Sequence, residues 1–396
     1  MPRTAKLVGV RWVETDKGSP ETPKIRSRLV AQEFANETDP DGELFAPTPP
    51  LAATRWLISG AASKGKDGPK EERLMLLDFK KAFLYADIER DLYVELPDDD
   101  ERKAGGANVG KLNKAMYGTR DAPAAWSRLV KSMLVDLNFV PLITTACVYI
   151  NRERGIIIVS HVDDFLCSGP IAQLQWLRST LKEKYEVDGD ILGWMPGECK
   201  EGKFLGRIIR YSDKGIEMEA DPKQVKGLIA EYGLEEAAGV DTPGLKGDSV
   251  DDHVEMPKKD ASRFRRGAAK LNYLSQDRVD IAYVSKEISK KMSNPGVNDE
   301  ALIKRVVRYL QRYPRLVMKY PWQDDCNEIA VYTDSDWGGC VKTRRSTSGG
   351  AIMRGGHLIA HWYRTQQLVA LSSAEAELNA AVKAAQEGLG ISHLQE

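Results

Sequence analysis

The chain has 396 residues, of which 42% are hydrophobic and 29% charged, and its formal net charge is −1. This length allows two or three globular domains, and the charge excludes a uniformly basic nucleic-acid-binding protein, although cations can still gather locally. No apolar run approaches the roughly 20 residues of a membrane span, and the N-terminus leads into no signal-like segment. The five cysteines are odd in number and scattered, which indicates reduced thiols in an intracellular protein rather than a disulfide framework or a zinc site.

Two strand-like segments open the chain, at residues 7–13 and 25–34, around a turn-rich stretch at 16–20. Lys24, Arg26 and Arg28 occupy alternate positions of the second segment, so one face of that strand is predicted to be cationic. A solvated edge strand is the alternative interpretation of the same pattern.

The next segments alternate between helix and strand patterns. A helix is predicted over residues 51–63, after a proline-rich joint, and an apolar strand then ends at Asp78 and Phe79. A strand at 92–97 precedes a solvated acidic loop over 98–106. From 124 to 139, apolar residues recur at helical spacing, which predicts a helix packed on the core.

Two adjacent acids, Asp163 and Asp164, stand at the tip of an apolar hairpin over residues 156–167. Carboxylates beside a hydrophobic run are costly unless a cation meets them, although an ordinary turn also explains the pair taken alone. With Asp78 at the end of a second apolar run, three carboxylates at strand ends favour a two-metal phosphoryl-transfer site. Asp78 and Asp163 are the natural pair to bridge two Mg²⁺ ions, or Mn²⁺ in their place.

A helix near 172–185 and a hairpin over 204–219 follow, and residues 239–260, rich in Gly, Pro and Asp, form the best linker candidate. Two basic helices are predicted beyond the linker, one from Ser262 and one over 299–313. Their cations are Arg263, Arg265, Arg266, Lys270, Lys304, Arg305, Arg308 and Arg312. A charged helix face is usually just solvated, but two in series favour contact with nucleic acid.

The composition shifts again near residue 327. Strand-like segments at 328–333, 348–353 and 357–363 precede a helix with Ser372 as N-cap and Glu375 three residues on, a capping box. The series predicts a separate α/β domain that is cut short.

Several blocks of this sequence, in order, resemble those of copia-type (Pseudoviridae-like) LTR retrotransposon reverse transcriptases. Residues 78–88 resemble the block D-V-K-T-A-F-L-N-G-D-L, and residues 28–34 resemble R-L-V-A-K-G-F. Residues 111–126 are similar to K-L-x-K-A-L-Y-G-L-K-Q-A-P-R-A-W, 204–206 to F-L-G, and 280–283 to the D-I-A-Y step. Residues 343–349 and 370–377 resemble the ribonuclease H segment that follows in the family.

The resemblance implies an α+β fingers–palm–thumb reverse transcriptase with a mixed palm sheet, followed by a truncated ribonuclease H-like α/β domain. We expect fingers and palm over residues 1–240, a linker with a basic helical thumb or connection region over 241–326, and a partial ribonuclease H-like domain over 327–396. The implied activity is RNA-directed DNA polymerisation, in which a primer 3′-hydroxyl attacks the α-phosphate of a dNTP at a two-metal site.

The resemblance also assigns residues. Asp78, Asp163 and Asp164 become the catalytic, metal-binding acids, and Phe83 becomes the aromatic ring that excludes a 2′-hydroxyl from the incoming nucleotide. Arg28, with Lys24 or Arg26, neutralises the triphosphate.

Two residues depart from the family pattern near the nucleotide. His161 stands where the family has Tyr, and its imidazole is titratable. Asp121 replaces Gln, and its carboxylate repels a triphosphate unless it is paired.

In the terminal domain, the resemblance makes Asp334 and Glu377 the first two acids of a partial ribonuclease H site, with Asp336 as a rival for the first role. The remaining two acids are expected beyond residue 396, so we expect the ribonuclease activity to be lost.

The implied partners are an RNA template, a DNA primer–template duplex and dNTPs, without a membrane, and other Pol segments such as integrase and protease in a parent polyprotein. The implied location is cytoplasmic, in virus-like particles, or nuclear. The alternative is a nucleic-acid-binding relic that keeps the fold without catalysis, which His161 and Asp121 motivate. A nuclease built on Asp334 and Glu377 alone is disfavoured because two acids are missing.

Overall fold

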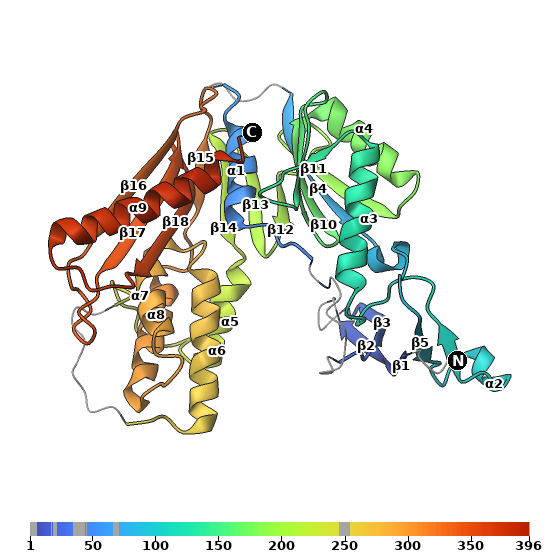
Figure 1. The fold of residues 1–396 in the computed structure, drawn as a ribbon, viewed down its shortest axis with the longest axis horizontal. Coiled ribbons are helices and arrows are strands. Elements are labelled where there is room, and N and C mark those ends of the chain that lie inside the picture. The colour runs from blue at the N-terminus through green and yellow to red at the C-terminus, as the bar shows by residue number, and fades with distance from the viewer. Residues whose placement is uncertain are drawn as a thin grey trace. The chain divides into compact units, whose positions relative to one another are not determined.

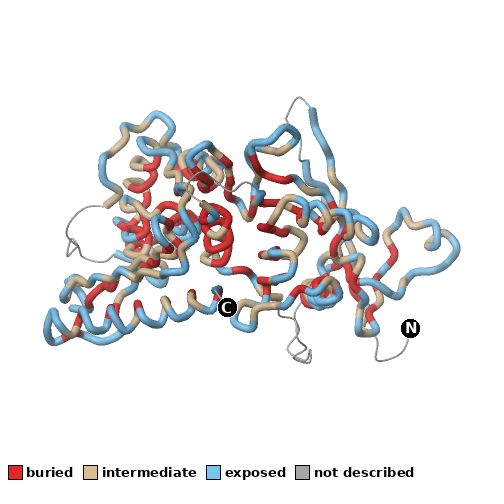
Figure 2. The backbone as a smooth tube through the Cα atoms, turned by 90° about the horizontal axis from the view of Figure 1, so that it is seen from above, coloured by how far each residue is buried: buried red, intermediate tan, exposed pale blue. Residues whose placement is uncertain are grey.

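Helices and strands are mixed along the whole chain, so the protein has the predicted α+β class (Figure 1). The computed structural model describes residues 6–16, 18, 22–34, 44, 46–65, 71–244 and 254–395. The chain forms two compact units, each assembled from several segments. Unit 1 comprises residues 1–49, 77–165 and 172–189, and unit 2 comprises 50–76, 166–171 and 190–396. Each unit contains buried segments of its own (Figure 2).

The N-terminal part of unit 1 consists of short strands. The strands β2 (Val10–Asp16) and β3 (Ile25–Ala31) form an antiparallel hairpin. A separate three-stranded sheet has the order β1-β5-β6, with bounds Lys6–Val8, Leu92–Glu95 and Val109–Lys111. A small apolar core of Val8, Ala31, Leu92, Val94 and Met116 joins these strands, which fixes the end of β3 against the segment that follows β6.

A six-stranded sheet has the order β11-β4-β10-β9-β8-β7. Its strands are β4 (Glu72–Phe79), β7 (Val140–Pro141), β8 (Val148–Asn151), β9 (Ile156–His161), β10 (Asp164–Pro170) and β11 (Val187–Leu192). The intervening segments include the 3₁₀ helix η1 (Ala82–Tyr85) and the helices α2 (Glu101–Ala104), α3 (Ala122–Asp136) and α4 (Ile171–Lys182). Most residues of the sheet strands β4, β9 and β10 are buried, as in strands that are covered on both faces.

In unit 2, a four-stranded antiparallel sheet has the order β12-β13-β14-β15, with bounds Glu201–Phe204, Arg207–Ser212, Gly215–Ala220 and Met318–Pro321. Four helices share one apolar core, and they are α5 (Pro222–Tyr232), α6 (Lys258–Leu274), α7 (Val279–Ser289) and α8 (Glu300–Arg312). The short η2 (Val297–Asp299) leads into α8, where Ile303, Val306, Val307 and Leu310 form the buried stripe.

The C-terminal elements are a three-stranded antiparallel sheet and a long helix. The strands β16 (Ile329–Ser335), β17 (Thr347–Arg354) and β18 (His357–Thr365) are followed by α9 (Ser373–Ser392), which packs on β16 and β17 (Figure 1). Ser372 accepts a hydrogen bond from the Glu375 N–H, and the Glu375 carboxylate accepts one from Leu371 N–H, so the predicted N-terminal cap is present.

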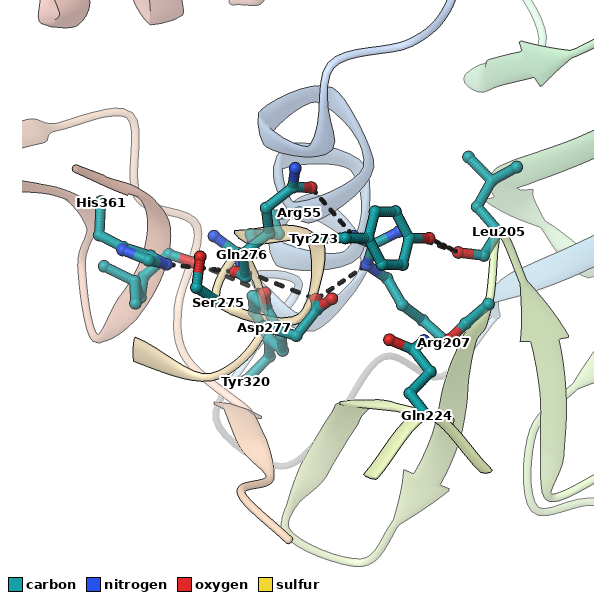
Figure 3. A network of polar contacts seen from close by, with 12 residues as sticks. Arg55, Leu205, Arg207, Gln224, Tyr273, Ser275, Gln276, Asp277, Tyr320 and His361 are labelled. Atoms are coloured by element: carbon teal, nitrogen blue, oxygen red, sulfur yellow. Dashed lines mark hydrogen bonds and ion pairs between the residues drawn. The ribbon is translucent and has the colours of Figure 1, made fainter. Parts of the chain in front are cut away.

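A buried polar network joins distant segments of unit 2 (Figure 3). Asp277, in the α6–α7 connection, accepts a 2.8 Å hydrogen bond from Arg207 Nε of β13 and lies 3.8 Å from Arg55 Nη2. Arg55 belongs to α1 (Leu51–Ala62), and it also donates to the Gln276 carbonyl. Because all three charged side chains are almost fully buried, both arginines depend on Asp277 for neutralisation.

Several predictions of local structure are wrong. Helices α5 and α7 and the strands β6, β7, β8, β11, β12 and β15 were not predicted. The acidic stretch contains helix α2, capped by Asp100, instead of a loop throughout. The helix expected from Ser262 begins at Lys258, so the predicted linker over 239–260 is shorter at its C-terminal end. Its centre, 245–253, and most of the turn at 16–20 lie outside the described residues. The predicted boundaries at 240 and 326 stay a prediction.

None of the described helices is both long and apolar enough to cross a membrane. All five cysteines are free, and Cys147 and Cys167 are buried.

Candidate active site

Asp78 and Asp163 lie on neighbouring chain segments at one end of the six-stranded sheet. Asp78 is the penultimate residue of β4, and Asp163 lies in the two-residue turn between β9 and β10. The Phe79 N–H donates to the Asp163 carbonyl at 2.9 Å. Asp163 therefore lies opposite Phe79, the residue that follows Asp78. The Phe79 ring is buried against Phe165 and Trp126, with centroid distances of 4.8 and 5.4 Å, which anchors this connection.

The turn that carries Asp163 is strained. Val162 has a φ of +52°, in the left-handed region. Two-residue hairpins need positive φ at their first central residue, and glycine usually occupies that position. A β-branched residue there costs on the order of 1–3 kcal/mol, and such strain persists only where the surroundings enforce it.

Tyr117 is a residue that the sequence did not single out, although it lies at the centre of the predicted site. Its ring packs edge-on against Phe83 at 5.0 Å between centroids, and the Arg28 guanidinium lies 5.5 Å from its centroid. Burial raises the pKa of Tyr117, the negative charges of Asp163 and Asp78 add to this effect, and Arg28 and Arg26 oppose it. One phenol therefore lies within electrostatic range of two predicted catalytic acids and two predicted phosphate-binding cations.

The position of Tyr117 depends on its contact with β3. The Ala31 N–H donates to the Tyr117 carbonyl at 2.7 Å, which docks the end of β3 on the turn that follows β6. The next residue, Gly118, has a φ of +88°, and a Cβ there would lie 2.0 Å from the Ala31 carbonyl oxygen. Only glycine fits this close approach, so Gly118 is what lets Arg28 reach the ring of Tyr117.

Asp121 is paired, which removes the objection to its negative charge. Arg90 Nε and Nη2 each donate to its carboxylate at 2.8 Å, and the same guanidinium donates to both oxygens of Glu33 at 2.6 Å. Burial opposes ionisation of Glu33, but the hydrogen bonds from Arg90, the Arg120 N–H and Lys6 outweigh it and lower its pKa to about 2. The pKa of Asp121 is also lowered, because Arg90 outweighs burial.

His161, at the end of β9, is neutral near pH 7. Burial lowers its pKa, and the nearby Asp163 offsets this only in part. Its Nδ1 is buried and has no hydrogen-bond partner. At neutral pH the His161 imidazole therefore adds no positive charge beside the predicted catalytic acids.

The predicted acids do not form a closed metal cage. Among the described residues, no three His, Cys, Asp or Glu side chains lie close enough together to hold a metal ion. Asp164 is the first residue of β10, directly after Asp163. It does not complete a group of three metal ligands with Asp78 and Asp163. The donor chemistry still suits magnesium, since Mg²⁺ prefers carboxylate oxygens, keeps several waters and commonly uses only one or two carboxylates with substrate phosphates.

Of the three predicted phosphate-binding cations, the structure brings two to the site. Arg26 and Arg28 both act on Tyr117, and Arg28 Nε is buried without a hydrogen-bond partner. Lys24 precedes β3, and its backbone N–H donates to the carboxylate of Asp16, the last residue of β2. Of the two predicted companions of Arg28, Arg26 is the one whose charge acts on Tyr117.

The two acids of the predicted ribonuclease H site are not brought together. Glu377 of α9 accepts hydrogen bonds from the Ser335 N–H and Oγ, so the Ser335 side chain lies on the α9 side of β16. Asp334 is the next residue along the strand and points to the opposite face. Asp336 accepts from the Thr347 and Gly339 N–H groups, which gives it a structural use in the turn after β16.

The cations of the two basic helices are engaged within the protein. Arg266 and Lys270 pair with Glu231, Arg263 and Lys304 with Glu300, and Arg312 with Asp241. Arg265, Arg305 and Arg308 donate to Met292 O, Thr242 Oγ1 and Ala238 O. Four of these partners, Glu231, Ala238, Asp241 and Thr242, come from α5 and the segment after it, so the sequence of the basic helices alone does not reveal them.

Comparison with known proteins decides the family. A family model described as reverse transcriptase (RNA-dependent DNA polymerase) matches residues 1–246. The chain belongs to this reverse transcriptase family.

Its relatives include retrotransposon polyproteins. It is 27% identical over 407 residues to the retrovirus-related Pol polyprotein from transposon TNT 1-94 of Nicotiana tabacum, covering 98% of this chain and 29% of that protein. It is 26% identical over 394 residues to the Pol polyprotein from transposon RE2 of Arabidopsis thaliana, covering 98% and 26%. The predicted membership of the copia-type reverse transcriptases is confirmed, and the chain spans less than a third of the length of these relatives.

Among solved structures, a foamy viral protease–reverse transcriptase in complex with double-stranded DNA is similar with a TM-score of 0.28 and 12% identity. That match covers 97% of this chain and 56% of the viral chain.

Proposed function

We propose that this reverse transcriptase extends a DNA primer on an RNA template, with Asp78 and Asp163 as its central catalytic acids. The observation that carries the proposal is the hydrogen bond between Phe79 N–H and the Asp163 carbonyl, which joins the two acid-bearing segments. Phe83 and Arg28 both contact Tyr117, and the charges of Asp163 and Asp78 act on the Tyr117 phenol. Carboxylates, an aromatic ring and a guanidinium group therefore lie near one another, and these are the groups that would bind the metal ions, the sugar and the phosphates of a nucleotide triphosphate.

Each side chain has a role that its chemistry supports. Magnesium ions bound by Asp78 and Asp163, with Asp164 beside them, would activate the primer 3′-hydroxyl and stabilise charge on the leaving phosphate oxygen. Arg28 and Arg26 neutralise the triphosphate, and the Arg90 pairing keeps the Asp121 charge from repelling it. The Phe83 ring, backed by Tyr117, closes on the sugar and excludes a 2′-hydroxyl. His161, uncharged at neutral pH, packs under the primer end.

Within this proposal, residues 1–240 form fingers and palm, residues 241–326 the thumb or connection region, and residues 327–396 part of a ribonuclease H-like domain. The template is RNA, the product strand is DNA, and other Pol segments such as integrase and protease belong to a parent polyprotein. Ribonuclease activity is not expected from this chain, because Asp334 and Glu377 lie on different sides of β16.

Primer extension with Asp163→Asn tests the proposal. The intact chain, Mg²⁺, dNTPs and a DNA primer on an RNA template should give extended product. The variant should lose on the order of 10³-fold or more of kcat, because removal of a charge that stabilises the transition state costs several kcal/mol. Asp87→Asn is the matched control, since Asp87 is an exposed carboxylate paired with Lys114.

The binding-relic alternative predicts a different result. Equal extension by the chain and by Asp163→Asn, or none by either, together with normal binding of an RNA–DNA hybrid, would favour that alternative and reject the polymerase.

A further inference from the structure

The strained turn at Val162 is held by one side chain. The indole Nε1–H of Trp126 donates to the Val162 carbonyl at 2.6 Å. Trp126 lies on α3 and is 1% exposed, so its ring is surrounded by packed side chains, Phe79 among them. The bond therefore acts on the one residue of the turn whose backbone conformation is unfavourable.

Trp126 also contacts the segment that carries Asp78. Its ring meets Phe79 edge-on at 5.4 Å, and the Phe79 N–H holds the Asp163 carbonyl. One buried indole thus connects the two acid-bearing segments, through packing on the β4 side and through a hydrogen bond on the turn side. Neither contact involves a catalytic atom, which distinguishes Trp126 from the residues of the site itself.

We infer that Trp126 is a positioning residue that enforces the left-handed conformation of Val162 and so presents the Asp163 carboxylate toward Asp78. This inference rests on the proposed function, because it concerns the same pair of acids. Without the indole N–H, the Val162 carbonyl loses the partner that fixes its direction, and the turn relaxes toward conformations that a β-branched residue prefers. The Asp163 carbonyl, one residue on, then no longer faces Phe79 N–H.

Trp126→Phe removes the N–H while keeping an aromatic ring against Phe79. We expect kcat for primer extension to fall about tenfold, with KM for dNTP little changed and with more Mg²⁺ needed for half-maximal activity. Hydrogen exchange of the Phe79 amide should become faster, and this readout does not depend on activity. Trp56→Phe is the control, because Trp56 is also a buried tryptophan, 7% exposed, and belongs to unit 2.

Val162→Gly separates positioning from mere packing. Glycine adopts positive φ without strain, so the turn no longer needs the indole to enforce it. In the Val162→Gly background, Trp126→Phe should therefore reduce kcat by less than about threefold, compared with about tenfold in the natural background.

Three results would overturn the inference. One is a Trp126→Phe variant with a lower unfolding midpoint but unchanged kcat, Mg²⁺ dependence and Phe79 exchange. Another is the same loss of kcat in both backgrounds. The third is an equal loss in Trp56→Phe. A wild-type chain that extends no primer rejects the proposed function instead, whereas faster exchange of the Phe79 amide would still support the positioning role.

Discussion

Phe83 has the packing that a selective ring needs. It is half-buried on η1, and Tyr117 holds it from one side at 5.0 Å between centroids, so it cannot turn aside without losing that contact. A ring held in place excludes a substituent by volume, which is a stronger barrier than a flexible side chain offers.

We therefore expect Phe83→Val to lower the ratio of kcat/KM for dNTP over rNTP on the order of 10–100-fold, mainly by raising rNTP use. Single-nucleotide incorporation with matched dNTP and rNTP measures this ratio. Leu84→Ala is the neighbouring control, because Leu84 is 44% exposed on the same short helix. An unchanged ratio in Phe83→Val would assign the ring to the core.

Much of the site, but not Tyr117, was predicted from the sequence. Asp78 and Asp163 are recognisable because acids at the ends of apolar strands are unusual, and the hairpin between β9 and β10 is as predicted. Tyr117 gave no such signal, because its place depends on a hydrogen bond to Ala31, which is distant in the sequence. The partner of Asp121 was missed for the same reason, since nothing near residue 121 points to Arg90.

At the scale of elements, Arg90 connects the segment after β3 with the beginning of α3. It binds Glu33, whose side chain is fully buried, and Asp121, the residue that precedes α3. Two acids therefore share one cation. Removal of Arg90 would leave the buried carboxylates without this partner, and a buried carboxylate without a partner destabilises the folded protein.

Arg90→Met should accordingly destabilise the protein by about 2–3 kcal/mol, less than for an isolated buried pair because Lys6 and the Arg120 N–H still bind Glu33. Denaturant unfolding measures the change. Adding Glu33→Gln and Asp121→Gln should recover most of it, because no buried charge then lacks a partner. Arg102→Met is the control, because Arg102 forms an exposed pair with Asp100 and its loss should leave the denaturation midpoint nearly unchanged. An equal loss in both variants would contradict the argument.

Helices were predicted well where their apolar stripe is long and poorly where it is short. The stripe of α3 and that of α8 are clear, whereas α5 and α7 each have 11 residues and follow turns or charged residues. Their helical state is supported by the shared core of α5 to α8, which no single segment reveals.

At the scale of the whole molecule, buried histidines couple folding to pH. Burial lowers the pKa of His161, His357 and His361 below the ordinary value of 6.5. His357 has both ring nitrogens engaged, with Ser59 Oγ at 2.9 Å and the Pro321 carbonyl at 2.8 Å, and this arrangement suits the neutral ring. The unfolded chain therefore binds protons more readily than the folded chain just below pH 6.5.

This difference in proton binding makes the free energy of unfolding decrease as pH falls below about 6.5. The stability contributed by these neutral histidines is fully present above about pH 6.5 and is lost as pH falls, by up to about 1.4 kcal/mol per pH unit for each histidine. We expect the thermal unfolding midpoint to be flat between pH 7 and 8 and to fall from pH 6.5 to 5. His357→Gln, which keeps a donor and an acceptor, should reduce the slope. A wild-type midpoint that does not change between pH 7 and 5 would refute the coupling.

During synthesis, helix α1 is made long before the residues that it contacts. Ser59 of α1 bonds His357, which lies 298 residues later, and Arg55 bonds Gln276, 221 residues later. At about 5–20 residues per second, a ribosome needs roughly 15–60 s to supply His357 after Ser59. Until β15 and β18 have been made, an apolar helix with a buried arginine and a buried serine lacks part of the surface on which it docks. Nascent chains stalled between these positions should therefore bind chaperones that recognise exposed apolar segments, and completed chains should not.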